Sequence, residues 1–233
     1  GTMKSAIRTE ELVEKHSRIM DKYDPEKRVA LIIDEWGTWF DCEPGTNPGF
    51  LYQQNTMRDA LVAGTSLNIF NNHSDRVRMT NIAQTINVLQ AVILTEGEKM
   101  ILTPTYHVYD MYKVHQDAML LDFALICDDY EYDGETLKQV NASVSKDKDG
   151  NINMTLCNID PNKAAKVSCY IGDIAGIKEV CGTILTSDAM NDHNTFEQPE
   201  NVKPEAFDGF TVDGGNLTIN MPSKSVVLLT IKA

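Results

Sequence analysis

The stretch Val29-Ala30-Leu31-Ile32-Ile33-Asp34-Glu35-Trp36-Gly37-Thr38-Trp39 decides the fold of this chain. Its five aliphatic residues, without polar alternation, predict a strand buried on both faces, as in parallel sheets covered by helices. Two carboxylates follow at the carboxyl end of this strand, where α/β barrels hold their reactive groups. Strict alternation along the strand would point Asp34 away from Glu35.

A carboxylate beside tryptophans at a strand end suits sugar chemistry. An indole ring stacks on a sugar ring, and a carboxylate can attack or stabilise an electron-poor anomeric carbon. The alternative interpretation is that Asp34 and Glu35 only cap the loop that follows. The pattern by itself leaves both interpretations open.

Helical and strand patterns alternate over the first half of the chain. The order helix, strand, helix, strand, helix is typical of the last part of a (β/α)8 barrel, although two strands cannot close one. This half therefore predicts the carboxy-terminal portion of a TIM barrel, over residues 1–117. The expected elements are a helix capped by Thr9 and ending near residue 23, a strand over 29–33, a helix over 53–72, a strand over 76–79 and a helix over 104–116.

After residue 118 the apolar residues recur with a period of two. Ile152, Met154 and Leu156 alternate with polar neighbours, and the same alternation continues across an Asp-Pro-Asn turn at 160–162, at positions 165, 167, 169 and 171. Several short strands at such spacing predict an antiparallel β-sandwich, of jelly-roll type, over residues 118–233. Residues 186–209 lack a regular pattern and are expected to form a long connection.

The charge balance restricts the partners. The 21 basic and 34 acidic residues give a net charge of −13, which argues against nucleic acid or an anionic membrane as the main partner. No stretch approaches the roughly 20 apolar residues that span a bilayer. The first residues lack the apolar core of a signal peptide. Gly1-Thr2 before Met3 resembles a cloning remnant, so the compartment stays open between cytoplasmic, periplasmic and secreted.

The five cysteines are odd in number and include no Cys-x-x-Cys pair. This pattern argues against a disulfide framework and against a zinc site. We expect most of these cysteines to be small buried hydrophobic residues. No other pattern indicates a metal or a cofactor, and none is predicted.

Several separated blocks resemble one known family. In their order and residues they are similar to the carboxy-terminal half of glycoside hydrolase family 51, the α-L-arabinofuranosidases, over nearly the whole chain. The blocks are Ala30-Leu31-Ile32-Ile33-Asp34-Glu35-Trp36-Gly37-Thr38-Trp39, Arg58-Asp59-Ala60-Leu61, Asn81-Ile82-Ala83-Gln84-Thr85-Ile86-Asn87, Tyr109-Asp110-Met111-Tyr112-Lys113-Val114-His115, Asn158-Ile159-Asp160-Pro161-Asn162-Lys163 and His193-Asn194-Thr195-Phe196.

The resemblance implies a retaining hydrolase that releases terminal α-L-arabinofuranose from arabinan- or arabinoxylan-type glycans. It implies that Glu35, at the end of the seventh barrel strand, is the nucleophile. It further implies that Trp36 and Trp39 line the sugar site and that Gln84 hydrogen-bonds the sugar. Without the resemblance, Gln84 would be interpreted as an ordinary amide at a helix start.

The chain also departs from the family. Gly37 stands where many relatives have Asn, which puts the contacts of that loop in doubt. The family's acid/base glutamate follows an Asn, and this chain contains no Asn-Glu pair. Glu96 and Glu98 fall in a polar hairpin beyond the second strand and are not accepted as substitutes.

Two functions remain open from the sequence. The first is a glycosidase fragment whose missing half supplies the acid/base, so that the chain alone is inactive. The second is a non-catalytic carbohydrate-binding or structural sandwich with a partial barrel. In either case, two open strands predict association into a homo-oligomer or with a missing amino-terminal half.

Overall fold

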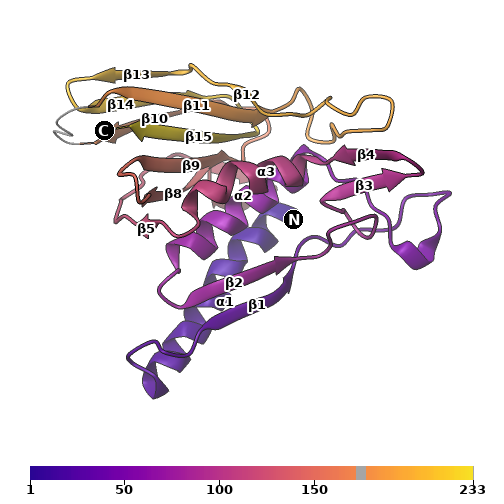
Figure 1. Ribbon diagram of the computed structural model, residues 1–233, viewed down its shortest axis with the longest axis horizontal. Helices are drawn as coiled ribbons and strands as arrows, with labels where there is room; N and C mark the ends of the chain where they lie inside the picture. The colour runs from indigo at the N-terminus through magenta and orange to yellow at the C-terminus, as the bar shows by residue number, and fades with distance from the viewer. Residues whose placement is uncertain (172–176, 233) are drawn as a thin grey trace.

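The computed structural model describes residues 1–171 and 177–232 as layers of sheets and helices (Figure 1). A three-stranded sheet lies on a six-stranded sheet, helices cover the far face of the larger sheet, and a parallel pair of strands lies beyond the helices. None of the described helices combines the length and apolar character needed to cross a bilayer.

The first half of the chain contains the helices and the parallel strands. Its elements are α1 (Thr2–Tyr23), β1 (Leu31–Trp36), the 3-10 turn η1 (Pro48–Phe50), α2 (Met57–Asn72), β2 (Val77–Ile82), β3 (Ile93–Glu96), β4 (Lys99–Leu102), α3 (Pro104–Tyr112) and the 3-10 turn η2 (Lys113–His115). β1 and β2 are parallel neighbours, and β3 and β4 form an antiparallel hairpin. The described residues contain this two-stranded parallel sheet and no closed barrel.

Helix α1 starts earlier than the sequence predicted. It begins at Thr2 rather than after Thr9, because Met3 and Ala6 are buried against the other helices and the sandwich. This packing stabilises a first turn that lacks a side-chain cap. The predicted cap at Thr9 is therefore wrong.

The strand β1 is covered on one face only. Leu31 and Ile33 pack against a small cluster that includes Val13 of α1 and Ile69 of α2. Residues 31–33 are only half-buried. The prediction of burial on both faces is wrong for the described chain, because helices cover one side of this sheet and no other described element covers the second.

A one-residue bulge interrupts β1 directly before its end. Ile33 pairs with Thr80 and Trp36 with Ile82, so three steps along β1 match two along β2. The extra residue places Trp36 on the helix-covered face together with Ile33. Alternation no longer holds across Asp34 and Glu35, and both of these side chains are exposed.

The second half of the chain forms the predicted sandwich. Its elements are β5 (Met119–Leu120), β6 (Asp129–Tyr132), β7 (Glu135–Lys138), β8 (Val140–Lys146), β9 (Ile152–Asn158), β10 (Ala165–Tyr170), β11 (Glu179–Thr186), β12 (Glu205–Ala206), β13 (Phe210–Asp213), β14 (Asn216–Met221) and β15 (Ser225–Lys232). The larger sheet has the order β12-β11-β15-β9-β8-β5 and the smaller one β10-β14-β13. Apolar side chains of both sheets, among them Leu156, Leu217 and Leu229, form the core between them.

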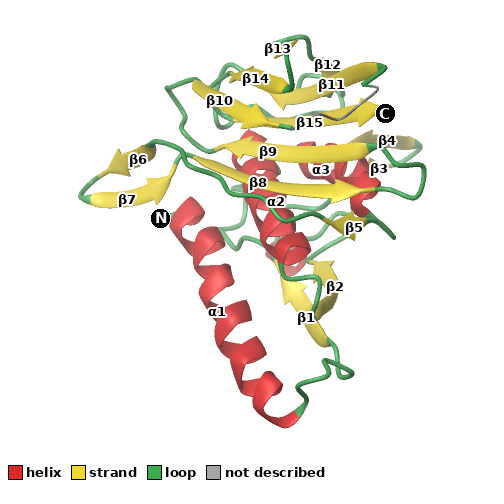
Figure 2. Cartoon of the chain, turned by 90° about the vertical axis from the view of Figure 1, so that its left-hand side faces the viewer, coloured by secondary structure: helices red, strands yellow, loops and turns green. Residues whose placement is uncertain are grey.

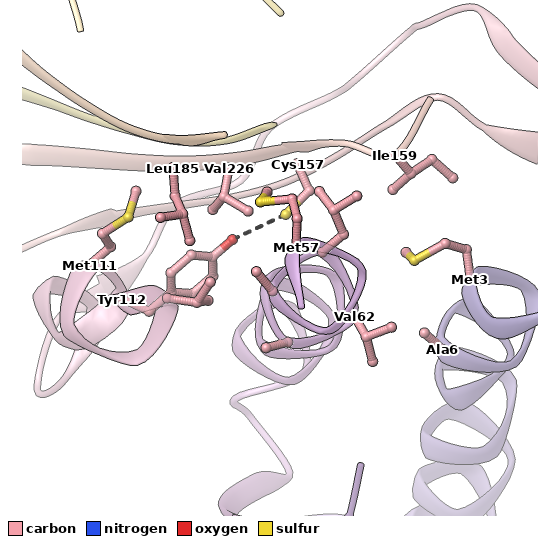
Figure 3. Close-up of a cluster of buried hydrophobic side chains, with 14 of the residues drawn as sticks. Met3, Ala6, Met57, Val62, Met111, Tyr112, Cys157, Ile159, Leu185 and Val226 are labelled. Carbon is pink, nitrogen blue, oxygen red and sulfur yellow. Dashed lines mark hydrogen bonds between the residues drawn. The ribbon is translucent and has the colours of Figure 1, made fainter. Parts of the chain in front are cut away.

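The helices and the sandwich share a second core (Figure 3). Helix α2 lies between α1 and α3 beneath the larger sheet, and Cys157 of β9 faces Tyr112 of α3 at 3.6 Å between sulfur and hydroxyl oxygen. The hairpin β6–β7 reaches the start of α1, where Lys4 forms an ion pair with Glu135 (Figure 2). The division into two domains at residue 118 stays a prediction, since the two halves are packed together.

The cysteines differ from the expectation. All five are free, and only Cys157 is fully buried, whereas the other four are partly exposed. The prediction that most of them are buried is therefore wrong.

Candidate functional site

Two predicted site residues, Glu35 and Gln84, lie at the same edge of the sheet because their strands are parallel. Trp36 is paired with Ile82 at the ends of β1 and β2, and the backbone N–H of Ala83 donates to the carbonyl of Trp36 at 2.9 Å. Glu35 therefore lies beside the strand end from which Gln84 emerges, after a cis Ala83–Gln84 peptide bond. Both side chains are exposed. An exposed carboxylate and an exposed amide thus share one edge of the sheet.

Trp36 lies on the other side of its strand. Its ring packs edge-on against Phe70 of α2, with centroids 5.4 Å apart, and stacks on Tyr109 of α3 at 6.4 Å. The indole N–H is buried and finds no hydrogen-bond partner among the described residues. Burial raises the pKa of Tyr109, so this hydroxyl stays protonated. Trp36 is thus packed between the helices and the sheet, and its predicted contact with a sugar stays a prediction.

Trp39 is presented on the loop that follows β1. Its side chain is 66% exposed. The path of this loop depends on Gly37, whose φ of +147° is rarely open to residues with a side chain. A Cβ at this position would also lie 3.2 Å from the carbonyl oxygen of Ala83. Position 37 therefore favours glycine, because the loop has a positive φ there and passes close to the end of β2.

Buried polar side chains hold this loop. Thr38 donates from its hydroxyl to the carboxylate of Asp59 at 2.9 Å. Asp59 is almost fully buried and also accepts the backbone N–H of Thr56, which completes a capping box at the start of α2. The amide nitrogen of the buried Gln90 donates to the backbone oxygen of Thr38. Thr38 is thus held from two directions, directly before Trp39.

A second set of contacts holds the other side of Trp39. The backbone N–H of Phe40 donates to the side-chain oxygen of Gln53 at 2.6 Å. The guanidinium of Arg58 lies 3.9 Å above the centre of the Phe40 ring, a cation–π arrangement. The backbone on both sides of Trp39 is thus held, although the Trp39 side chain is exposed.

These bracing residues were not predicted from the sequence. The pattern Thr56-Met57-Arg58-Asp59 is a helix-capping signal that could have located Asp59. No local pattern identifies Gln53 or Gln90, because their partners are up to 52 residues away. Their burial is the property that distinguishes them.

A cavity of about 330 Å³ opens beside the loop. Trp36, Thr38, Trp39 and Phe40 line one side, and the first turns of α1 line the other with the hydroxyls of Ser5 and Thr9. Among the described residues, no group of three His, Cys, Asp or Glu side chains is arranged to hold a metal ion. The cavity is thus lined mainly by hydroxyls and aromatic rings, and neither Glu35 nor Gln84 is among the residues that line it.

Comparison with known proteins places these residues in a family context. Residues 34–225 match the family model described as the alpha-L-arabinofuranosidase C-terminal domain. An intracellular exo-alpha-L-arabinofuranosidase of Bacteroides ovatus is 47% identical over 232 residues, which are 99% of this chain and 45% of that protein. A second relative, an intracellular exo-alpha-(1->5)-L-arabinofuranosidase of Streptomyces lividans, is 23% identical and is covered over 31% of its length.

Solved structures of arabinofuranosidases superpose on this chain. The GH51 arabinofuranosidase from Xanthomonas axonopodis pv. citri superposes with a TM-score of 0.95 and 47% identity, over 99% of this chain and 46% of that one. A family 51 alpha-L-arabinofuranosidase from Bifidobacterium longum superposes with a TM-score of 0.80 at 21% identity, which shows a common fold. The chain thus spans less than half the length of the relatives that it matches.

Proposed function

The chain belongs to the α-L-arabinofuranosidases of glycoside hydrolase family 51, whose carboxy-terminal half it matches, and we propose that it supplies the nucleophile and part of the sugar site of such an enzyme. The observation that supports this most directly is the position of Glu35, exposed at the carboxyl end of β1 and beside Gln84. The proposed substrate is a terminal α-L-arabinofuranosyl residue of an arabinan- or arabinoxylan-type glycan.

In the proposed reaction, Glu35 acts as a nucleophile. A carboxylate oxygen of Glu35 attacks the anomeric carbon, and the bond from that carbon to the leaving oxygen breaks as the new ester bond forms. Water then attacks the same carbon and releases Glu35, so that the configuration is retained. Gln84 would donate a hydrogen bond to a sugar hydroxyl, and Trp39 would offer its indole face to the ring.

Trp36 has a different place in this proposal. Since its ring packs against Phe70 and Tyr109, it would fix the end of β1 and thereby orient Glu35. For Trp36 itself to contact the sugar, the sugar would have to reach the edge of the indole ring through the cavity beside α1.

A retaining mechanism needs a second carboxyl about 5 to 5.5 Å from the nucleophile, to protonate the leaving oxygen and later activate water. The sequence contains no Asn-Glu pair at which the family's acid/base would lie. We therefore propose that this group comes from outside these 233 residues, as part of a (β/α)8 barrel in which β1 and β2 are the last two strands.

The first experiment separates the enzyme from a non-catalytic module. This chain is joined to the amino-terminal half of the Bacteroides ovatus relative and assayed on an aryl arabinofuranoside, next to the chain alone. The joined protein should turn over, and the chain alone should be slower by at least the 10²–10⁴-fold that acid catalysis typically contributes. Equal turnover by the chain alone would contradict the proposed division of the catalytic groups.

The second experiment tests the nucleophile in the joined protein. Glu35→Gln should lower turnover by several orders of magnitude, because the amide has nearly the same shape but cannot attack carbon. A fluorinated arabinosyl label should attach to the peptide that contains Glu35. Glu98→Gln, in the exposed turn of the β3–β4 hairpin, serves as the control and should leave turnover unchanged. Attachment of the label to another carboxylate would exclude Glu35 as the nucleophile.

The open strands lead to a proposal about assembly. Among the described residues β1 and β2 each pair on one side only, and Met79 of β2 exposes 51% of its surface. We propose that this surface is covered by an amino-terminal half or by a second copy of the chain. Light scattering at high protein concentration that reports only a monomer would count against the second arrangement.

A further inference from the structure

Two buried glutamines hold the backbone on either side of Trp39. The amide nitrogen of Gln90 donates to the backbone oxygen of Thr38, and the side-chain oxygen of Gln53 accepts the backbone N–H of Phe40 at 2.6 Å. Gln90 exposes 3% of its surface and Gln53 exposes 1%. Burial of an amide is costly unless its groups are hydrogen-bonded, so these contacts persist in the folded chain.

Gln90 belongs to the same loop as Gln84. This loop leaves the end of β2 and returns to β3. Its two ends are joined where the backbone N–H of Val92 donates to the carbonyl of Gln84 at 3.0 Å. The side chain of Gln90 therefore connects the loop that carries one proposed sugar contact, Gln84, to the loop that carries the other, Trp39.

The backbone at Gln90 is itself fixed. The buried side chain of Asn55 donates to the carbonyl of Gln90 at 3.0 Å and to the hydroxyl of Thr105 at 2.8 Å. The backbone N–H of Gln53 donates to the carbonyl of Leu89 at 2.9 Å. Because Gln90 extends from a fixed backbone, its side chain transmits the position of one loop to the other.

The hydrogen bonds of Gln90 have a defined direction. Its amide nitrogen also donates to the hydroxyl oxygen of Thr38, and that hydroxyl donates onward to the carboxylate of Asp59. The carbonyl of Thr38 can only accept, so the nitrogen of the Gln90 amide has to face it. The amide oxygen of Gln90 finds no partner among the described residues, so no competing contact there favours the flipped orientation.

We propose that Gln90 is a positioning residue, which couples the loop of Gln84 to the loop of Trp39 and so presents both sugar contacts in one arrangement. This inference rests on the proposed function for its effect on turnover. Gln90 acts through Thr38 rather than by contact with the sugar. A site arranged before the sugar arrives loses less conformational entropy on binding.

Gln90→Met tests the role of the amide, because it keeps the length of the side chain and removes the donor. In the joined protein it should lower kcat/KM on an aryl arabinofuranoside by roughly ten- to a hundredfold, since small misplacements of contacting groups are costly. Unchanged kcat/KM would overturn the proposal.

Gln139→Met is the matched control. Gln139 is also a buried glutamine, 4% exposed, and its amide nitrogen donates to three acceptors in the second half of the chain. The variant should unfold at a lower urea concentration and keep the kcat/KM of the wild type. An equal loss of kcat/KM in Gln139→Met and Gln90→Met would assign a merely structural role to Gln90.

Gln90→Glu keeps the shape of the side chain and makes the donor depend on pH. A carboxylate cannot donate to Thr38, whereas a neutral carboxyl group can donate once. Burial raises the pKa of a carboxyl group, and Asp59, which is paired with Arg58 at 3.1 Å, disfavours a second negative charge beside the Thr38 hydroxyl. The kcat/KM of Gln90→Glu, relative to the wild type, should therefore rise as the pH falls. A ratio that is independent of pH would overturn the donor role.

Trp39→Ala tests whether Gln90 acts through the loop after β1. In that background Gln90→Met should lower kcat/KM by a smaller factor than in the otherwise unchanged protein, because one of the two contacts that Gln90 positions is already lost. The same factor in both backgrounds would overturn the coupling to Trp39.

A measurement on the chain alone separates this inference from the proposed function. NMR relaxation of the backbone N–H of Trp39 reports its fast mobility. Gln90→Met should increase this mobility and Gln139→Met should not. If the label attaches elsewhere than Glu35 while Gln90→Met still mobilises Trp39, the nucleophile is wrong and the coupling stands. If Glu35 is labelled and Gln90→Met leaves the mobility of Trp39 unchanged, the coupling is wrong and the nucleophile stands.

Discussion

The hydroxyl of Thr38 donates a hydrogen bond to the buried carboxylate of Asp59, and this contact joins the loop after β1 to the first turn of α2. Asp59 also caps the helix, so the position of the loop is coupled to the start of α2. The backbone N–H groups of Met57 and Arg58 donate in turn to carbonyls in the sandwich segment 186–209. The exposed Trp39 is thus supported, through Thr38 and α2, by the second half of the chain.

Thr38→Val should destabilise this support. Valine keeps the shape of threonine but leaves a buried oxygen of Asp59 without one partner, which costs about 1–3 kcal/mol. Urea unfolding should show this loss of stability as a lower free energy of unfolding. The acrylamide quenching of Trp39 fluorescence should also differ between the variant and the wild type. Thr211→Val, at an exposed position of β13, is the control and should change stability by less than about 0.5 kcal/mol. Equal stability of the two variants would contradict a bracing role for Thr38.

Gln84→Ala should affect turnover in the joined protein far less than Glu35→Gln does. It removes one neutral hydrogen bond to the sugar, worth about 0.5–1.5 kcal/mol, or roughly two- to twelvefold in kcat/KM. The measurement is steady-state kinetics on an aryl arabinofuranoside. A loss of several orders of magnitude would give Gln84 a role beyond sugar binding.

Gly64→Ala should destabilise the contact between α2 and the sandwich. A Cβ there would lie 2.5 Å from the sulfur of Cys157 and 3.1 Å from the hydroxyl oxygen of Tyr112. Overpacking typically costs about 1–3 kcal/mol, which outweighs a gain in helix propensity of up to about 1 kcal/mol. The free energy of unfolding in urea is the measurement.

A second substitution tests the cause of this loss. Cys157→Ala removes the sulfur, so Gly64→Ala should be tolerated better in that background than in the wild type. The difference between the two backgrounds is the coupling energy of a double-mutant cycle. Purely additive effects would show that the sulfur is not the obstacle.

Stability should fall as the pH is lowered from about 6.5 towards 4. Burial of His115, between the hydroxyls of Ser145 and Thr155, lowers its pKa to about 4 from 6.5. Since the folded pKa lies below the unfolded one, the unfolded chain takes up this proton first. The stability is fully present above pH 6.5 and is lost as the pH falls towards 4, by up to about 3 kcal/mol.

His115→Asn isolates this contribution from the carboxylates and from His107, whose pKa is also lowered by burial. The variant should lose less stability than the wild type between pH 7 and pH 5 in urea unfolding. Parallel pH profiles of the two proteins would show that His115 does not titrate on unfolding in this range.

Local patterns in the sequence were sufficient for much of the architecture. The aliphatic run before Asp34 and Glu35 predicted the strand β1, because five such residues have few other stable environments. The period-two pattern around Met154 predicted the sandwich, because side chains of a strand alternate between its faces. The separated blocks indicated the family, which the comparisons confirm.

Other features depended on residues far apart in the chain. Trp36 turned toward the helices because the register between β1 and β2 slips by one residue, and a register belongs to a pair of strands. The early start of α1 and the partial exposure of four cysteines follow from packing against distant elements.

By itself, the sequence predicted two strands that precede Glu35 and Gln84, although β1 and β2 each end three residues beyond the predicted ends at 33 and 79. Only the tertiary structure decided which of the neighbouring side chains are held there, because Thr38 and Gln90 are 52 positions apart. The physical reason is that the period of a helix or strand fixes the face on which a side chain lies. The contacts of that side chain depend on how separate elements pack, and no local sequence pattern records this packing.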